Sequence, residues 1–356
     1  MTRLIFAGGF LGAGKTSLLF EATAILKKRG LTTGLITNDQ ATDLADTVLL
    51  GHQDVTVAEV AGSCFCCDFK GLRKAIEKTG KPEVIIAEPV GSCTDLSATL
   101  INPIRDMMKT DLSVGPLTVL ADPARLKAIF EEDDDALHPA AAYIIKKQLE
   151  ESDIIAISKT DLYTEREISE ISGLLQKNFP ENEIITISSK TNSGIESWLD
   201  CVLSRDDAGK HIPDIDYDRY AQGEAVLGWL NCLASLSGNK VNWDDFTVRL
   251  MKALAGEFDN KKLHVGHVKI IVENGDRYIS ANLTGKSETL TSRWSAGTGD
   301  RAEMILNARV EMPPEELQKL FVKEFEWVAG DTVKVHINRI RSISPGYPKP
   351  TYRYKK

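Results

Sequence analysis

The sequence predicts an α/β protein in which a doubly wound, mainly parallel sheet is followed by a smaller C-terminal α+β domain. Short Ile, Val and Leu-rich runs alternate with helix-like segments through the first 200 residues. Continuous apolar runs of this kind are typical of parallel strands buried on both faces. A polar stretch containing Pro213 then interrupts the pattern, and the order of elements changes beyond it. The expected divisions are residues 1–205, a linker at 206–218, a second domain at 219–344 and a tail at 345–356.

Each expected element of the first domain follows from local composition. The strands are predicted from short apolar runs bounded by polar or glycine residues, at Arg3–Ala7, Gly34–Thr37, Val55–Val60, Val84–Ala87, Leu117–Ala121, Ile154–Ile157 and Ile184–Ile187. The helices are predicted between them, among others at Lys15–Arg29, Ala140–Glu150 and Glu165–Lys177. Strand and helix alternation predicts a doubly wound sheet.

The second domain is predicted to mix strands and helices in another order. A helix opened by Asn242 covers 243–258, and another follows Pro313-Pro314 to about Phe325. Strands are expected at 225–234, 263–273, 277–283, 304–311 and 332–340. This order favours a split βαβ core like that of ferredoxin-like domains. The Pro, Tyr and Lys-rich tail is expected to be frayed.

Bulk composition excludes several classes of protein. The chain has 356 residues and a net charge of -8, so broad binding to nucleic-acid phosphates is not expected. No stretch approaches the ~20 apolar residues of a membrane-spanning helix, and the apolar run at the N-terminus is too short for a signal peptide. We therefore expect a cytoplasmic protein, in which six cysteines do not form a disulfide framework.

A phosphate-binding loop follows the first predicted strand. Residues Gly9–Thr16 fit the pattern G-x-x-x-x-G-K-[ST] and open a helix. Glycines let the backbone direct N–H groups at phosphates, and the helix N-terminus adds a positive dipole end. The first domain is therefore predicted to be a P-loop NTPase sheet. Its predicted nucleotide contacts here are Gly9, Gly12, Ala13, Gly14, Lys15, Thr16 and Ser17.

Two carboxylates are candidates for the magnesium site. Glu88 ends an apolar strand in the run E-P-V-G, and Asp39 ends another strand. Ligands of α/β sheets bind at the carboxyl ends of strands. We therefore predict that Thr16, Asp39 and Glu88 bind Mg²⁺, and that Lys15, Asp39 and Glu88 form the catalytic set.

A second nucleotide-binding segment predicts specificity for GTP. Ser158-Lys159-Thr160-Asp161 follows a buried strand and resembles the [NS]KxD element of GTPases. A carboxylate can accept hydrogen bonds from guanine N1–H and N2–H₂, which adenine does not offer, and a lysine stem can lie along the ring. Ser158, Lys159 and Asp161 are therefore predicted to contact the base. The later run Ser188, Ser189 and Lys190 is predicted to contact the base oxygen.

Cysteines cluster between a strand and a helix, at Cys64, Cys66 and Cys67. Thiolates select soft or borderline ions such as Zn²⁺ or Cu⁺, and three sulfurs leave a fourth position open. Cys93 is a candidate fourth ligand or second contact. Two other interpretations are packing as small hydrophobic groups and redox chemistry.

Together these motifs resemble the CobW-like GTPases, also called cobalamin-synthesis-protein-like, which are related to the hydrogenase- and urease-maturation GTPases. The resemblance rests on Gly9–Thr16, Ser63–Cys67, Glu88–Cys93 and Ser158–Asp161, and it covers about the first 200 residues. The family motif usually reads G-C-x-C-C, and Ser63 replaces its glycine here.

The resemblance implies a GTP-hydrolysing metallochaperone, with GTP, Mg²⁺ and Zn²⁺, Co²⁺ or Ni²⁺, that delivers metal to a client metalloprotein. It also implies nucleotide-dependent dimerisation. Two alternatives stay open. One is a GTPase chaperone of a corrinoid enzyme or the cobalamin pathway. The other is a GTP switch that binds a partner through its C-terminal domain and holds only structural zinc.

Overall fold

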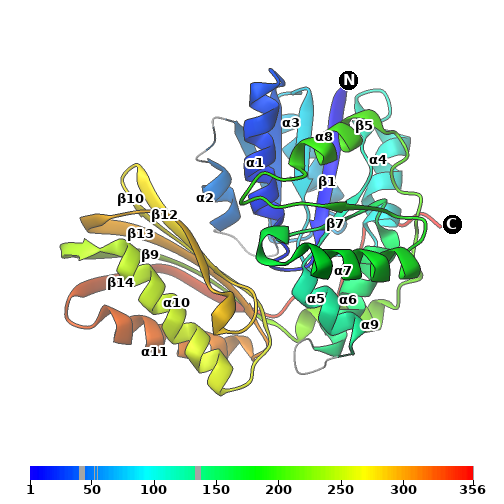
Figure 1. The fold of residues 1–356 in the computed structure, drawn as a ribbon. Helices are drawn as coiled ribbons and strands as arrows, with labels where there is room; N and C mark the ends of the chain where they lie inside the picture. Colours follow the sequence, from blue (N-terminus) through cyan, green and yellow to red (C-terminus); the bar gives the residue numbers. More distant parts are fainter. Residues whose placement is uncertain (40–44, 52, 54, 133–137, 356) are drawn as a thin grey trace. The chain divides into compact units, whose positions relative to one another are not determined.

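The computed structural model describes residues 1–356 apart from 40–44, 52, 54, 133–137 and 356 (Figure 1). The chain forms two compact units. The first comprises Met1–Gln40, Asp46–Ala221 and Tyr347–Lys356. The second comprises Ala41–Ala45 and Gln222–Gly346. Among the described residues, no helix has the length and apolar character needed to cross a membrane.

The first unit is built on a parallel sheet in the order β3-β2-β4-β1-β6-β7-β8, with the short β5 also beside β1. All its strand pairs are parallel, so the carboxyl ends lie along one edge. The strands are β1 (Thr2–Gly9), β2 (Thr33–Asp39), β3 (Thr56–Ala61), β4 (Val84–Glu88), β5 (Leu112–Val114), β6 (Thr118–Ala121), β7 (Ile154–Ile157) and β8 (Glu183–Thr186). The seven predicted strands are confirmed within two residues at each end, and β5 was not predicted.

Helices connect these strands, as the alternating pattern predicts. They are α1 (Lys15–Lys28), α2 (Ala45–Gly51), α3 (Phe69–Lys78), η1 (Ser97–Ile101), α4 (Asn102–Met107), α5 (Pro123–Phe130), α6 (Pro139–Glu151), η2 (Thr160–Leu162), α7 (Glu165–Asn178), α8 (Ile195–Ser204) and α9 (Tyr217–Ala225). The three predicted helices correspond to α1, α6 and α7.

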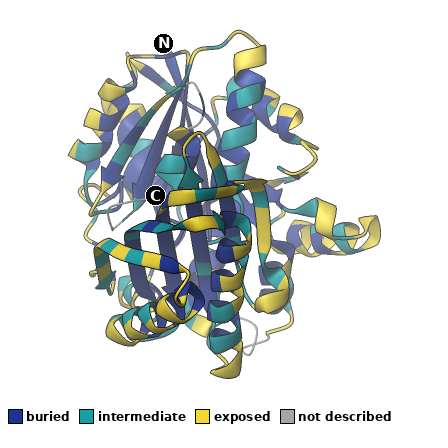
Figure 2. Ribbon diagram, turned by 90° about the vertical axis from the view of Figure 1, so that its left-hand side faces the viewer, coloured by how far each residue is buried: buried dark blue, intermediate teal, exposed yellow. Residues whose placement is uncertain are grey.

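The core of the first unit explains why its strands are apolar on both faces. Ile5 and Ala7 of β1 pack with side chains of α1 and α8 in one buried cluster. Phe6 points to the opposite face, where its ring meets Phe65 at 6.4 Å. Figure 2 shows most strands of this sheet in the dark blue of buried residues, whereas the edge strands β3 and β8 are more exposed. The predicted doubly wound parallel sheet is therefore confirmed.

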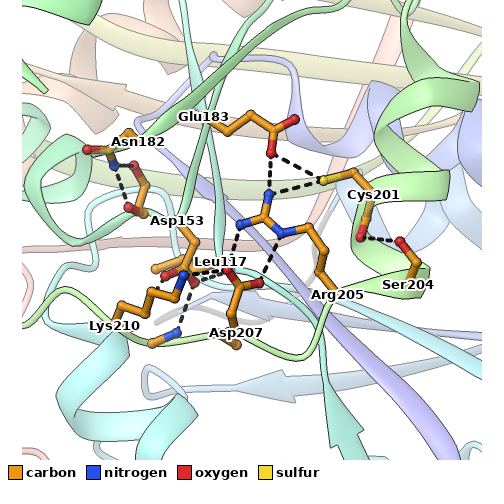
Figure 3. Close-up of polar contacts among 12 residues, drawn as sticks. Leu117, Asp153, Asn182, Glu183, Cys201, Ser204, Arg205, Asp207 and Lys210 are labelled. Atoms are coloured by element: carbon orange, nitrogen blue, oxygen red, sulfur yellow. Dashed lines mark hydrogen bonds and ion pairs between the residues drawn. The ribbon is translucent and has the colours of Figure 1, made fainter. Parts of the chain in front are cut away.

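The stretch predicted to be a linker packs against the first unit (Figure 3). The Asp153 carboxylate accepts hydrogen bonds from the backbone N–H of Leu117 at 2.7 Å and of Gly209 at 2.9 Å. Arg205 pairs with Asp207 at 2.7 Å. Backbone N–H groups of this stretch are therefore partners for the buried Asp153, and the units divide between residues 221 and 222.

The second unit is an antiparallel sheet in the order β12-β11-β10-β13-β9-β14. Its elements are β9 (Gly228–Asn242), α10 (Trp243–Asn260), β10 (Val265–Asn274), β11 (Arg277–Leu283), η3 (Ser287–Thr289), β12 (Thr291–Ser295), β13 (Thr298–Val310), α11 (Pro314–Ala329) and β14 (Val333–Ile343). Helices α10 and α11 pack together against the sheet in one apolar core. The Asn242 side chain caps α10, as predicted, by accepting from the N–H groups of Asp244 and Asp245.

This order contains two β-α-β units, β9-α10-β10 and β13-α11-β14, with the β11-β12 hairpin between them. It agrees with the expected split βαβ arrangement. The strand expected at 225–234 begins three residues later, because Ala225 ends α9. Strand β12 was not predicted, since its residues are mostly exposed and lack an apolar face.

One buried acid in the first unit predicts a pH-dependent stability. Glu151 ends α6 with no solvent exposure and accepts hydrogen bonds from Thr94 Oγ1 at 2.9 Å and the Ser97 N–H at 3.1 Å. Burial raises its pKa from 4.5 to about 8. Between these values the folded state binds a proton that the unfolded state releases. The free energy of unfolding should therefore fall as pH rises from about 5 to 8 and level off above that.

Replacing Glu151 with Gln should remove this slope, because the amide is neutral at every pH and can keep both contacts. Urea unfolding of both proteins from pH 5 to 9 measures the effect, whose limit is about 1.4 kcal/mol per pH unit. Glu150→Gln, on the exposed side of the same helix, is the matched control. Parallel curves for wild type and Glu151→Gln would contradict the prediction.

Candidate functional site

The turn between β1 and α1, which is the predicted phosphate-binding loop, forms a cradle of backbone around Lys15. Gly9 has a φ of 125°, and a Cβ there would lie 2.4 Å from the carbonyl oxygen of Leu120, so only glycine fits. Gly14, with a φ of 98°, precedes the first residue of α1. The Lys15 ammonium donates to the carbonyl oxygens of Gly9 at 2.9 Å and Phe10 at 3.2 Å, and its side chain is buried. The helix N-terminus and this cation together favour a bound anion.

Oxygen ligands gather around Thr16, the residue after this lysine. Its hydroxyl lies 2.6 Å from Asp46 Oδ1 and 3.2 Å from Glu88 Oε1. Lys15 Nζ is 3.8 Å from the same Glu88 oxygen. Carboxylate and hydroxyl oxygens are the ligands that Mg²⁺ prefers, so this donor set fits a magnesium ion.

Of the other carboxylates at this edge of the sheet, Asp39 was predicted from the sequence and Asp46 was not. Asp39 ends β2, two residues beyond Thr37, which pairs with Glu88 across the sheet. It therefore lies at the same edge, and its role as a magnesium ligand stays a prediction. Asp46, in the first turn of α2, was not predicted. The only signal for Asp46 is an acidic residue in a first helical turn, which many helices share.

The two loops predicted to bind the base lie side by side. Ser188 Oγ donates to Asp161 Oδ1 at 2.6 Å, and Lys190 Nζ lies 3.8 Å from the other oxygen of Asp161. Ser189 lies between these two residues in the chain. The carboxylate is thereby oriented at the carboxyl edge of the sheet, beyond β7 and β8.

The lysine of the same segment is also held in place. Lys159 takes a left-handed conformation, with a φ of 55°, and its ammonium lies 2.6 Å from Asp122. The Ser158 hydroxyl donates to the carbonyl oxygen of Ala121 at 3.3 Å. Asp122, which also caps α5, was not predicted, because it is distant from Lys159 in sequence.

The cysteine turn between β3 and α3 is shaped by Asn38. Its amide donates to the carbonyl oxygens of Val60 at 2.8 Å and Ser63 at 2.7 Å, and its oxygen accepts from the Phe65 N–H at 2.8 Å. Asn38 immediately precedes Asp39, so the same strand end contributes to the cysteine turn and to the edge with Glu88. The role of Asn38 was not predicted.

Three thiols converge on this turn. Cys66 Sγ lies 2.9 Å from Cys64 Sγ and 3.8 Å from Cys67 Sγ, and all three sulfurs lie within 4.8 Å of one another. Cys64 and Cys66 are buried, whereas Cys67 is partly exposed. Hydrogen bonds that the protonated Cys66 thiol makes with Cys64, Cys67 and Cys93, together with burial, raise the pKa of Cys66 well above its usual value. Cys93 therefore interacts with Cys66, although its sulfur does not belong to the group of three.

Protonated thiols at these distances form only weak hydrogen bonds with one another. A soft cation would replace the protons and bind all three sulfurs, so metal uptake should release protons. The donor set fits Zn²⁺, Co²⁺ or another thiophilic ion. All six cysteines are free thiols, and Cys201 and Cys232 lie outside the cluster.

The loop after β4 connects the sheet edge that bears Glu88 to the cysteines. It begins at Glu88 and reaches Cys93 five residues later. A Cβ on Gly91 would lie 3.0 Å from the backbone nitrogen of Leu11 in the phosphate cradle, so the two loops are in close contact. Gln148 holds the loop by donating to the carbonyl oxygens of Gly91 at 3.0 Å and Cys93 at 2.7 Å. A movement of the phosphate cradle would therefore be transmitted to Cys93 through the packed backbone of this loop.

Comparison with known proteins agrees with this geometry. Residues 3–186, more than half of the chain, match the family model described as CobW/HypB/UreG, nucleotide-binding domain. The "Zinc-regulated GTPase metalloprotein activator 1" of Schizosaccharomyces pombe is 24% identical over 181 residues, which are 48% of this chain and 41% of that protein. The chain therefore spans less than half of that relative's length.

Solved structures are also similar. The hydrogenase maturation factor HypB of Archaeoglobus fulgidus is 18% identical, with a TM-score of 0.42 over 56% of this chain and 87% of that one. The Zn(II)-bound YjiA GTPase of E. coli is 14% identical, with a TM-score of 0.35 over 90% of this chain and 98% of that one.

Proposed function

Because the chain belongs to the CobW/HypB/UreG nucleotide-binding domain family, we propose that it hydrolyses GTP and couples hydrolysis to delivery of a thiolate-bound transition metal to a client metalloprotein. The observation that carries the proposal is the group of three sulfurs within 4.8 Å, next to strand ends that also bear the nucleotide loops. In this proposal the metal is cargo that the protein delivers, and it is not a resident cofactor. The name of the fission-yeast relative makes zinc the first ion to test.

The nucleotide end of the mechanism uses residues of the cradle and the base loops. Lys15 would exchange its two carbonyl partners for phosphate oxygens and neutralise charge that develops during transfer. Thr16, Glu88 and Asp46 would hold Mg²⁺, which supplies further neutralisation of the phosphates when bound. Asp161 would accept from guanine N1–H and N2–H₂, with its carboxylate kept in place by Ser188.

The cargo end would use Cys64, Cys66 and Cys67, with Cys93, which interacts with Cys66, as a candidate fourth thiol. The γ-phosphate would order the strand ends that carry Asp39 and Glu88, and its loss would release them. Because Asn38 and the loop 88–93 connect these ends to the thiols, release would alter the arrangement of the sulfurs. The metal would then pass to the ligands of the client.

The test is GTP hydrolysis by metal-free protein, titrated with Zn²⁺, Co²⁺ and Ni²⁺. We expect one ion to bind tightly and to change the hydrolysis rate or the nucleotide affinity. A variant in which Cys64, Cys66 and Cys67 are all alanine should lose both effects and keep metal-independent hydrolysis. Cys201→Ala, which removes a thiol outside the cluster, is the matched control and should behave as wild type.

Three results would contradict the proposal. If no ion changes the hydrolysis rate of wild type or of the variant, metal binding and hydrolysis are not coupled. The chain would then be a nucleotide switch. If GTP is not hydrolysed under any of these conditions, the proposed GTPase activity is wrong. Stimulation by a corrinoid in place of a metal ion would identify a cofactor chaperone.

A further inference from the structure

The C-terminal residues, which were expected to be frayed, lie across the cysteine turn. Thr351 donates from its N–H to the carbonyl oxygen of Cys66 at 2.7 Å and from its hydroxyl to that of Cys67 at 3.1 Å. The N–H of Lys349 donates to Cys67 Sγ at 3.2 Å. We call residues Tyr347–Tyr354 the C-terminal strap. They belong to the first unit together with the cysteines.

The strap is anchored beyond these contacts. The Tyr352 ring packs edge-on against Phe69, the first residue of α3, with centroids 5.0 Å apart. Arg353 pairs with Asp95 at 2.6 Å, and that carboxylate is fully buried. Tyr354 donates from its N–H to the carbonyl oxygen of Ala98 at 2.9 Å. Four successive residues therefore hold the strap to the turn, to a helix and to the loop after β4.

The position of the strap explains which thiol it affects. Cys64 and Cys66 are buried under the turn, so Cys67 is the most accessible sulfur of the cluster. The strap adds an N–H donor to that sulfur. A backbone N–H directed at a metal-bound thiolate stabilises its negative charge and fixes its direction. The tail sequence P-K-P favours an extended backbone on either side of this donor.

The geometry points to the C-terminal strap as part of the metal site: it holds Cys67 in its binding direction, covers the accessible side of the cluster and sets how long the metal stays bound. This inference rests on the proposed function, because it requires the thiols to bind a metal. A client that takes the metal has to lift the strap from Cys67 first. The same segment joins the buried Asp95, which follows Cys93 by two residues, so the strap contacts both parts of the chain that supply thiols.

The test compares release of Zn²⁺ from full-length proteins, each loaded with one equivalent, to the colorimetric chelator 4-(2-pyridylazo)resorcinol. Lys349→Pro removes the N–H donor to sulfur in a segment that is already proline-rich. Tyr352→Ala removes the packing against Phe69 and leaves the cysteine turn unchanged. Lys355→Pro, just beyond the strap, is the matched control for introducing a proline.

We expect both strap variants to release Zn²⁺ about tenfold faster than wild type, in line with the effect of removing outer contacts of metal ligands. The control should release it at the wild-type rate. Co²⁺ absorption should show three or four thiolate ligands in every protein, with a shifted thiolate band in Lys349→Pro. Thermal unfolding of the metal-free proteins identifies variants that are damaged globally.

Other results would overturn the inference in distinguishable ways. Equal release rates in all four proteins, with thiolate-bound Co²⁺ present, would leave the proposed function intact and assign the strap a purely structural role. Faster release in the Lys355→Pro control as well would show a nonspecific effect of the tail and overturn the inference. Wild-type protein without thiolate-bound metal would overturn both the proposed function and the role of the strap.

Discussion

Replacing Lys15 with alanine should reduce GTP hydrolysis about a hundred- to a thousandfold, the effect of removing one preorganised charge partner of the transferred phosphate. The ammonium is already held inside the cradle by the carbonyl oxygens of Gly9 and Phe10, so little reorganisation precedes its contact with phosphate. Steady-state phosphate release under saturating GTP measures the rate, and binding of a fluorescent GTP analogue measures the affinity.

The control for this variant is Lys27→Ala, in the exposed last turn of the same helix. It removes the same charge without touching the cradle and should hydrolyse GTP as wild type does. Thermal unfolding separates a local effect from a global one, because Lys15 also lies 3.8 Å from the buried Glu88. Unchanged hydrolysis in a folded Lys15→Ala protein would contradict a phosphate-binding role for this turn.

Replacing Asp161 with asparagine should lower GTP affinity about a hundredfold, because one of two acceptors for guanine becomes a donor facing N–H groups. The same change should raise the affinity for xanthosine triphosphate, whose carbonyl at C2 accepts from the new amide. Ser188 can still donate to the remaining oxygen, so the loop should keep its conformation. Competition between the two nucleotides measures the switch.

Asp200→Asn, at an exposed position of α8, is the matched control and should keep the wild-type preference for GTP. A variant at Asp161 that binds both nucleotides as wild type does would show that another group reads the base. Loss of both nucleotides together with a lower unfolding temperature would point to damage of the loop at Ser188.

The sequence predicts those parts of the fold and site that consecutive residues encode. Apolar runs identify the parallel strands, and the cradle, the base segment and the cysteine turn each lie within one short stretch. Asn38, Asp46 and Asp122 were missed, because their partners are brought to them by strand order and by loops distant in sequence. Single polar residues at strand and helix ends are too common to indicate such partners.

Two segments were interpreted as less ordered than they are, for one reason. The stretch 206–218 and the tail are polar and contain proline, which are ordinary features of linkers. In the structure their polar groups satisfy buried partners, such as Asp153 for Gly209 and Asp95 for Arg353. Composition indicates that a segment lacks a core of its own, but it does not indicate which core the segment will pack against.

The position of the strap in the chain determines the order in which its contacts break. Only Ser344, Pro345 and Gly346 separate β14 of the second unit from the strap. Peeling that starts at Tyr354 must break the contacts of Tyr354, Arg353, Tyr352 and Thr351 before it reaches Cys67. Pulling from β14 reaches Lys349 after the first few residues. The contact with Cys67 is therefore protected from loosening that starts at Tyr354, whereas tension that arrives through β14 reaches it almost at once.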